Sequence, residues 1–214
     1  MRGRGPRRVG RIIIHDGCAD GRISGAVASC LSGLGRVETR GGAAVDAGGA
    51  LMGTHGGAAM YEGHALRSAL SRAIGADQGI GTVHMLLTDM LVCTREGDRI
   101  HARTMMAPSP AIVSVRGIIE GPARPPGYYA DLAEFGRAGP ARGRYLEEGD
   151  PRIAGAACVC AYQAAAYCET GEGPCGDPGC VLYDAHLQGE LLGQAAGMRL
   201  CGRHPGLPGP RTFT

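Results

Sequence analysis

The sequence contains no lysine and no tryptophan, and it has only two phenylalanines. All 22 basic residues are therefore arginine, which we attribute to base-composition bias of the coding sequence. The net charge is only +2, whereas a domain that binds DNA or RNA through its phosphates is expected to be strongly basic. We therefore predict no nucleic-acid partner, and a core built from aliphatic side chains rather than aromatic ones.

Long hydrophobic runs are also missing. No segment approaches the ~18 apolar residues of a membrane span, and the N-terminus lacks the apolar segment of a secretory signal. The absence of lysine excludes a standard phosphate-binding loop of the GxxxxGK[ST] type. We predict a cytoplasmic protein with no membrane contact. The nine cysteines are then expected to be metal ligands or buried thiols rather than disulfides.

Glycine and proline, in contrast, are abundant, at 38 and 13 residues. They predict long connections within one domain over residues 11–204, preceded by a flexible basic leader at 1–10 and followed by a tail at 205–214. A strand, a helix and a strand at 11–15, 23–34 and 35–40 predict a parallel βαβ unit. The complete prediction is an α+β fold in which helices flank a mixed β-sheet of four or five strands.

The remaining elements follow from hydrophobic periodicity and composition. We predict strands at 82–87 (continuing to 93), 100–106 and 111–118, a hairpin turn at 95–98, helices at 64–74, 153–167 and 184–198, a helical turn at 132–137, and loops at 41–63 and 121–129. The helix at 153–167 is uncharged and rich in alanine, so it should be buried. Its Cys158 and Cys160 lie two positions apart and point to different faces, which favours packing over a shared metal.

The residues with the clearest chemistry lie near the C-terminus. Cys175 and Cys180 form a C-x4-C pair, and Cys201 and His204 form a C-x2-H pair about twenty residues later. Thiolates and imidazoles are the ligands that Zn²⁺ prefers, and four of them complete a tetrahedral structural site. The spacing therefore predicts a structural zinc knuckle. The alternative is that these residues are unrelated and their thiols are simply buried.

A helix that runs directly into a C-x4-C pair resembles the archaemetzincins, a family of small archaeal zinc metallopeptidases. Cys175 and Cys180 match the family's C-x4-C pair, and Gly171 matches the glycine of its HExxHxxGxxH motif. Cys201 falls one residue later than the family pattern, and His204 stands where its last cysteine would be. Upstream, residues 87–89 and 111–115 are similar to the family's Thr-Asp and Val-Ser segments. The resemblance covers roughly residues 80–204 and implies a metzincin-like fold, bound zinc, and a peptide or protein as substrate.

At the positions where the archaemetzincins have their catalytic residues, this sequence has different residue types. The three zinc-binding histidines fall on Ala164, Cys168 and Pro174, the general-base glutamate falls on Ala165, and the methionine of the Met-turn falls on Leu182. Alanine cannot bind a metal, and it cannot accept a proton from a metal-bound water. The catalytic HExxH residues are thus not retained. Residues 180–190 also resemble a related archaeal family described as metallopeptidases.

Two hypotheses of function follow. In the first, the protein is a metallopeptidase of archaeal type whose catalytic groups lie outside the usual motif. His186 and Glu190, at i and i+4 of the predicted helix that Asp184 would cap, are then the candidate catalytic or metal-binding pair; otherwise they are a solvated surface pair. His84 and His101, in predicted strands, are more simply explained as structural histidines. In the second hypothesis, the protein is a pseudoenzyme, a zinc-stabilised module that binds a peptide or protein.

Overall fold

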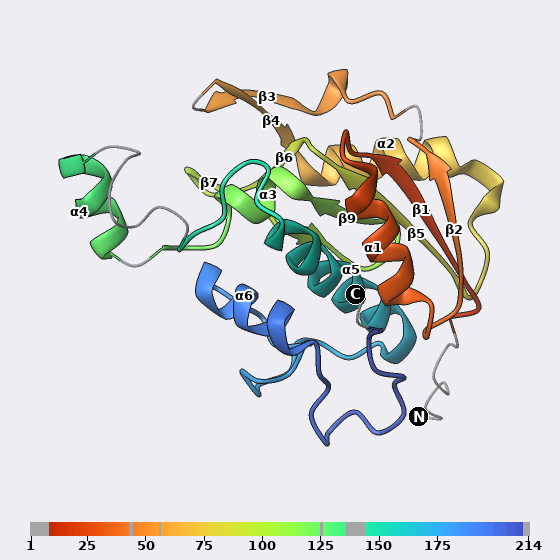
Figure 1. The fold of residues 1–214 in the computed structure, drawn as a ribbon. Coiled ribbons are helices and arrows are strands. Elements are labelled where there is room, and N and C mark those ends of the chain that lie inside the picture. Colours follow the sequence, from red (N-terminus) through yellow and green to blue (C-terminus); the bar gives the residue numbers. More distant parts are fainter. Residues whose placement is uncertain (1–8, 43–44, 56, 125, 136–143, 212–214) are drawn as a thin grey trace.

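The computed structural model describes residues 9–42, 45–55, 57–124, 126–135 and 144–211. The described chain forms two β-sheets, and helices cover both faces of the larger one (Figure 1). The five-stranded sheet has the order β2-β1-β5-β9-β8, and the four-stranded sheet has the order β3-β4-β6-β7. The predicted α+β class with flanking helices is confirmed, as is the aliphatic core.

The five-stranded sheet begins with the predicted βαβ unit. Its strands are β1 (Arg11–Gly17), β2 (Arg36–Gly41), β5 (Thr82–Thr88), β9 (Ala111–Ser114) and β8 (Met105–Met106). The first four are mutually parallel, and only β8 is antiparallel to its neighbour. Helix α1 (Gly21–Leu31) connects β1 to β2, and it begins where the Asp20 carboxylate accepts a hydrogen bond from the Arg22 backbone N–H.

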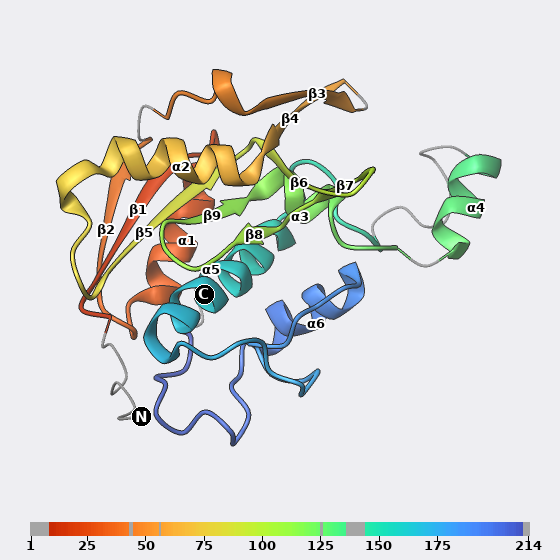
Figure 2. The same cartoon turned by 180° about the vertical axis from the view of Figure 1, so that it is seen from behind.

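Helices pack on the two faces of this sheet (Figure 2). One face is covered by α1, α3 (Val115–Glu120) and α5 (Arg152–Thr170), and the other by α2 (Gly63–Ile74). Helix α5 is buried from Ala156 to Ala166, as its alanine content predicts, because small side chains let it pack closely against α1 and the sheet. It ends at Gly171, whose φ of 69° is in the left-handed region that favours glycine.

The prediction of a loop at 41–63 is largely wrong. This segment contributes β3 (Leu51–His55) and β4 (Ala58–Glu62) to the second sheet, where β4 pairs with β6 (Leu91–Glu96) and β6 with β7 (Arg99–Ala102). Glycine and alanine give these strands no hydrophobic alternation. Among the described strands, β3 pairs only with β4, and β4 is joined to the rest of the sheet by β6, which lies about thirty residues further along the chain.

Three other predicted strands are interrupted. The strand predicted at 82–87 and continuing to 93 ends as β5 at Thr88, and the chain then enters the second sheet as β6. The strand predicted at 100–106 is split between the two sheets, because the chain crosses from β7 to β8 at Arg103, whose backbone N–H donates to the Val92 carbonyl. The strand predicted at 111–118 ends at Ser114, and α3 follows. The Ser114 hydroxyl accepts a hydrogen bond from the Gly117 N–H and thereby caps the helix.

The loop predicted at 121–129 is also partly wrong, because α4 (Pro126–Phe135) begins within it. Proline is well tolerated in the first turn of a helix, so its presence does not exclude one there. Part of the helical turn predicted at 132–137 belongs to α4, and residues 136–137 lie outside the described residues. In both views α4 stands away from the two sheets (Figures 1 and 2).

The C-terminal part of the chain follows α5. Helix α6 (Gln188–Gly197) is shorter than the predicted 184–198, and Asp184 does not cap it. Residues 205–211 lie against the helical layer: the Tyr162 hydroxyl donates to the Pro208 carbonyl, and the Arg211 N–H donates to the Cys30 carbonyl. Most of the predicted leader and the last residues of the predicted tail fall outside the described residues. None of the described helices has the length and hydropathy required to cross a membrane.

Candidate metal centre and the cavity beside α5

The four predicted ligands come together. One ligand atom from each of Cys175, Cys180, Cys201 and His204 lies within 4.8 Å of all the others. The Cys175 and Cys201 sulfurs are 3.7 Å apart. Two thiolates at ~2.3 Å from a tetrahedral ion would lie about 3.8 Å apart, so this spacing fits zinc. Within the described part of the chain, no other group of three His, Cys, Asp or Glu side chains has metal-binding spacing.

Backbone hydrogen bonds hold the two knuckles in place. In the first knuckle, the Cys180 N–H donates to the Asp177 carbonyl at 3.0 Å, and the Asp177 carboxylate accepts from the Gly179 N–H at 2.9 Å. The first knuckle is joined to the second by the Val181 N–H, which donates to the Arg199 carbonyl at 2.7 Å. Cys201 follows two residues later. The ligands are therefore positioned by main-chain contacts that require the folded C-terminal segment.

Two buried glutamines attach this segment to the helices. Gln163 of α5 donates through Nε2 to the Val181 and Tyr183 carbonyls, both at 2.8 Å. Gln194 of α6 donates to the Cys180 and Tyr183 carbonyls at 2.8 and 2.9 Å. Buried carbonyls need such partners, since leaving one unpaired costs about 1–3 kcal/mol. The first knuckle is thus clamped between α5 and α6.

Hydrogen bonds to the sulfurs favour thiolates, whereas burial raises the pKa of the Cys180 thiol. The Cys201 N–H donates to the Cys180 sulfur at 3.5 Å, and the Arg203 guanidinium donates to the Cys175 sulfur at 3.0 Å. A hydrogen bond from the Arg203 backbone N–H is the main reason that the pKa of Cys201 lies below its ordinary value. Three thiolates and a divalent ion leave one negative charge, which the Arg203 side chain can balance.

His204 supplies a further indication of a metal. Its Nε2 atom is buried and has no hydrogen-bond partner. An unpaired buried polar atom is unfavourable, and one ring nitrogen of His204 lies within 4.8 Å of the three sulfurs, where an imidazole is well suited to bind a cation. The donor set and its spacing therefore fit a structural ion.

The face of α5 that precedes this cluster has no comparable groups. Ala164 and Ala165, where the family resemblance places a zinc ligand and the general base, are completely buried. Cys168 is partly buried; its sulfur accepts a hydrogen bond from the Ser109 N–H at 3.3 Å, and burial raises the pKa of its thiol. These three side chains do not form a metal site.

His186 and Glu190 do not share a helical face, because α6 begins only at Gln188. The Glu190 carboxylate instead accepts hydrogen bonds from the His186 and Leu187 N–H groups, both at 2.9 Å, and caps the helix. The His186 side chain is exposed and lines a cavity of about 290 Å³ between α5 and the 101–105 segment. His101, Asp184 and Gln163 line the same cavity. The catalytic assignment of His186 and Glu190 stays a prediction.

Sequence reasoning missed Gln163, Gln194 and Arg203. A glutamine in the middle of an otherwise apolar, alanine-rich helix is a usable signal, because a buried amide must find partners. For Gln194 and Arg203 no local pattern exists, since their partners are fixed only by the path of the chain between residues 175 and 204.

Comparisons with known proteins agree with this geometry. The family model of DUF6775, described as a probable metallopeptidase family, matches residues 52–207. No curated protein matches the chain. Among solved structures, the fold is similar to an archaemetzincin from Methanopyrus kandleri, with 17% identity, a TM-score of 0.53, and coverage of 95% of this chain and 94% of that one.

Two other solved structures share the fold. A zinc-dependent peptidase from Methanocorpusculum labreanum has 16% identity and a TM-score of 0.58, over 91% of this chain and 97% of that one. An archaemetzincin from Archaeoglobus fulgidus, complexed with malonate, has 11% identity and a TM-score of 0.52, over 85% and 90%. The expectation of an archaemetzincin-like fold is therefore confirmed.

Proposed function

The chain belongs to DUF6775, a probable metallopeptidase family, and we propose that it binds a peptide or protein segment, with zinc serving its structure rather than hydrolysis. The observation that carries this proposal is the contrast between two neighbouring segments. The C-terminal cluster offers four ligand atoms within 4.8 Å of one another, whereas the buried face of α5 offers alanine.

The cluster supports a structural ion. Cys175, Cys180, Cys201 and His204 would fill the four positions of tetrahedral Zn²⁺ and leave none for a water molecule or a substrate. A metal in this place supplies a cross-link between two segments that are about twenty residues apart. It would hold the turn at 175–180 against residues 201–204, next to α5.

The α5 segment supports the absence of hydrolysis at the usual position. A catalytic zinc needs about three protein ligands, and a base is needed to take a proton from its water. Ala164 and Ala165 can do neither, and both are fully buried. A ligand would have to displace packed core atoms to reach them.

Peptide binding is supported by the end of the five-stranded sheet. Strand β8 pairs with β9 along one edge, and in the described ranges no strand pairs with its other edge. Thr104 and Met105 of this segment line the 290 Å³ cavity, and α5 contributes Cys160 and Gln163. An unpaired strand edge beside a cavity can accept an extended peptide through backbone hydrogen bonds.

A second candidate is hydrolysis through residues outside the usual motif. The observation that favours it is that His101, Asp184 and His186 line the same cavity. A metal or a proton-transfer pair at these side chains would act on a peptide at the β8 edge. The two candidates predict different metal contents and different effects of His186→Ala.

The deciding experiment is elemental mass spectrometry of the protein purified without added zinc, as wild type and as Cys180→Ser, together with cleavage assays on a quenched peptide library. The proposal predicts one zinc per chain, lost in Cys180→Ser, and no cleavage above background. It also predicts capture of library peptides by the wild type and weaker capture by Ala185→Phe, which fills the cavity. A second metal that survives Cys180→Ser, with cleavage abolished by His186→Ala, would establish the hydrolytic candidate instead.

A further inference from the structure

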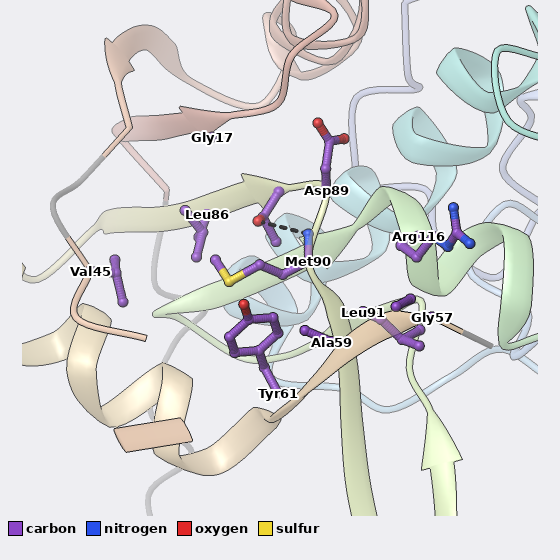
Figure 3. Close-up of a pocket in the computed structure, with 12 residues that line it drawn as sticks. Gly17, Val45, Gly57, Ala59, Tyr61, Leu86, Asp89, Met90, Leu91 and Arg116 are labelled. Carbon is purple, nitrogen blue, oxygen red and sulfur yellow. Dashed lines mark hydrogen bonds between the residues drawn. The ribbon is translucent and has the colours of Figure 1, made fainter. Parts of the chain in front are cut away.

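One unassigned feature is a cavity of about 630 Å³ at the carboxyl ends of β1 and β5 (Figure 3), and none of its described lining residues is a predicted metal ligand. Helix α1 leaves β1 on one face of the sheet, and α2 precedes β5 on the other face. The order of strands reverses between β1 and β5, and ligands of open parallel sheets bind in the crevice outside such a switch point. Gly17 and Thr88, the last residues of these strands, both line the cavity.

The lining of the cavity is divided between apolar and charged groups. Leu86, Met90 and Tyr61 lie together on one side, and the Asp89 carboxylate and Arg116 guanidinium point away from them (Figure 3). Asp89 and Arg116 also line a second cavity, of about 430 Å³, on the α1 side of the sheet. Asp89 and Arg116 thus place one anionic and one cationic group at the rim that the two cavities share.

Asp89 is available to a ligand. Its side chain is exposed, and one carboxylate oxygen accepts a hydrogen bond from the Ala19 N–H at 2.8 Å. Among the residues that the structure describes, no arginine or histidine forms an ion pair with it. The nearby Cys18 thiol adds no second negative charge, since burial and then the Asp89 charge raise the pKa of that thiol. The negative charge of Asp89 thus lacks a protein counterion.

Arg116 is incompletely paired. Its guanidinium lies 3.5 Å from Glu120 and 3.4 Å from Glu148, and the Glu148 side chain is 88% exposed. Its Nε atom is buried and has no partner. Long ion pairs to an exposed carboxylate contribute little, so a ligand carboxylate could replace Glu148 at modest cost.

We propose that this cavity binds a small zwitterion with an apolar side chain, that is, a free α-amino acid or a dipeptide. Its ammonium group is bound by Asp89, its carboxylate by Arg116, and its side chain by Leu86, Met90 and Tyr61. The volume is within the ~300–1,000 Å³ range of small-molecule sites. The site is separate from the zinc cluster and from the β8 edge, so it does not depend on the function proposed above.

The test is calorimetric titration of the zinc-loaded full-length protein with four probes: L-leucine, L-leucyl-L-leucine, N-acetyl-L-leucine and L-leucinamide. The last two each lack one charge. We expect leucine or dileucine to bind about tenfold or more tightly than either blocked compound, because each lost contact is a charge-assisted hydrogen bond. Tighter binding of leucine would assign a free amino acid, and tighter binding of dileucine a dipeptide.

Variants of Asp89 and Arg116 test which residue binds each charged group of the ligand. Asp89→Asn keeps an acceptor for the Ala19 N–H; it should weaken binding of leucine about tenfold and leave N-acetyl-leucine unchanged. Arg116→Gln should weaken leucine and N-acetyl-leucine but not leucinamide. Ala59→Phe fills the cavity and should abolish all binding. Asp98→Asn and Arg72→Gln remove exposed charges elsewhere and should have no effect.

Because the variants are compared between probes, a general loss of folding cannot imitate the expected pattern. The proposal is overturned if none of the four probes binds at millimolar concentration. It is equally overturned if the blocked compounds bind as well as leucine, or if Asp89→Asn and Arg116→Gln leave the affinity for leucine intact.

Discussion

The C-terminal cluster and the middle of α5 are adjacent along the chain, yet in the part of the chain that the structure describes only the cluster brings metal-binding side chains together. Four potential ligands converge in the cluster, and the Cys180 and Cys175 sulfurs accept hydrogen bonds from the Cys201 N–H and the Arg203 guanidinium. In α5 the corresponding face is filled by alanines that pack against the sheet and α1. The comparison teaches that two neighbouring segments of one scaffold can differ in their potential metal ligands, since the two segments use different side chains.

The largest effect is expected when one ligand of the C-terminal cluster is removed. Cys180→Ser should lose the bound metal and lower stability by more than about 3 kcal/mol, because metal binding at structural sites contributes directly to folding. The measurement is thermal and urea unfolding, with metal content determined in parallel. Cys93→Ser removes another buried thiol, in β6, and should retain the metal. Equal metal loss in both variants would contradict the assignment.

The second prediction concerns the introduction of a carboxylate into α5. Ala165→Glu restores a carboxylate where the family has its general base, but it places a charge in a completely buried position. We expect a loss of about 3–5 kcal/mol, as for a buried charge without a partner. Ala73→Glu, at an exposed position of α2, should change stability by less than about 0.5 kcal/mol. If Ala165→Glu were as stable as Ala73→Glu in urea unfolding, the site would be more open than its burial indicates.

A smaller effect should come from the contact between the two regions. Gln163→Leu removes the α5 donor of the Val181 and Tyr183 carbonyls, which should cost about 1 kcal/mol, because Gln194 still donates to both. The metal should remain bound but transfer faster to a competing chelator, as followed by absorbance. Gln78→Leu breaks exposed hydrogen bonds to Ser71 and serves as the control. Unchanged transfer rates in Gln163→Leu would show that α5 does not support the cluster.

The smallest expected effect is a dependence of folding stability on pH, and it arises from a residue outside the C-terminal cluster and α5. His15 of β1 is buried, and its Nε2 lies 3.1 Å from Nδ1 of His84. Burial, followed by the charges of His84 and Arg40, lowers the pKa of His15 below 6.5, while Asp77 and Glu38 oppose this shift. The unfolded chain therefore binds a proton that the folded chain excludes. Stability should fall as pH decreases through about 6.5.

Urea unfolding at pH 8, 7, 6 and 5 checks this prediction. His15→Leu should reduce the slope of stability against pH, whatever its effect on absolute stability. His64→Leu, at an exposed histidine of α2, should leave the slope unchanged. Identical slopes in wild type and His15→Leu would contradict the assignment to His15.

Much of the fold could be predicted where local pattern and burial coincide. The βαβ start, α2, β5 and the buried helix α5 all carry apolar residues at the period of their own structure. The missed elements have no such pattern. Strands β3 and β4 consist largely of small residues, and the start of α3 depends on the Ser114 cap within an apolar run that also suits a strand.

The candidate site, like the fold, could be predicted only in part from the sequence. The sequence by itself determined the donor set, because the type and spacing of Cys175, Cys180, Cys201 and His204 are chemical properties of the chain. It also places alanine at the α5 positions that the resemblance indicates for a zinc ligand and the general base, and an alanine side chain has no metal-binding atom in any fold.

Only the tertiary structure decided which distant groups meet. The link from Val181 to Arg199 joins the two knuckles, and the Gln163 and Gln194 side chains attach the first knuckle to α5 and α6; no motif encodes these contacts. The same is true of Asp89 and Arg116, which line one cavity because β5 and β9 are neighbours in the sheet. Side-chain chemistry is a local property, whereas convergence depends on how the whole chain packs.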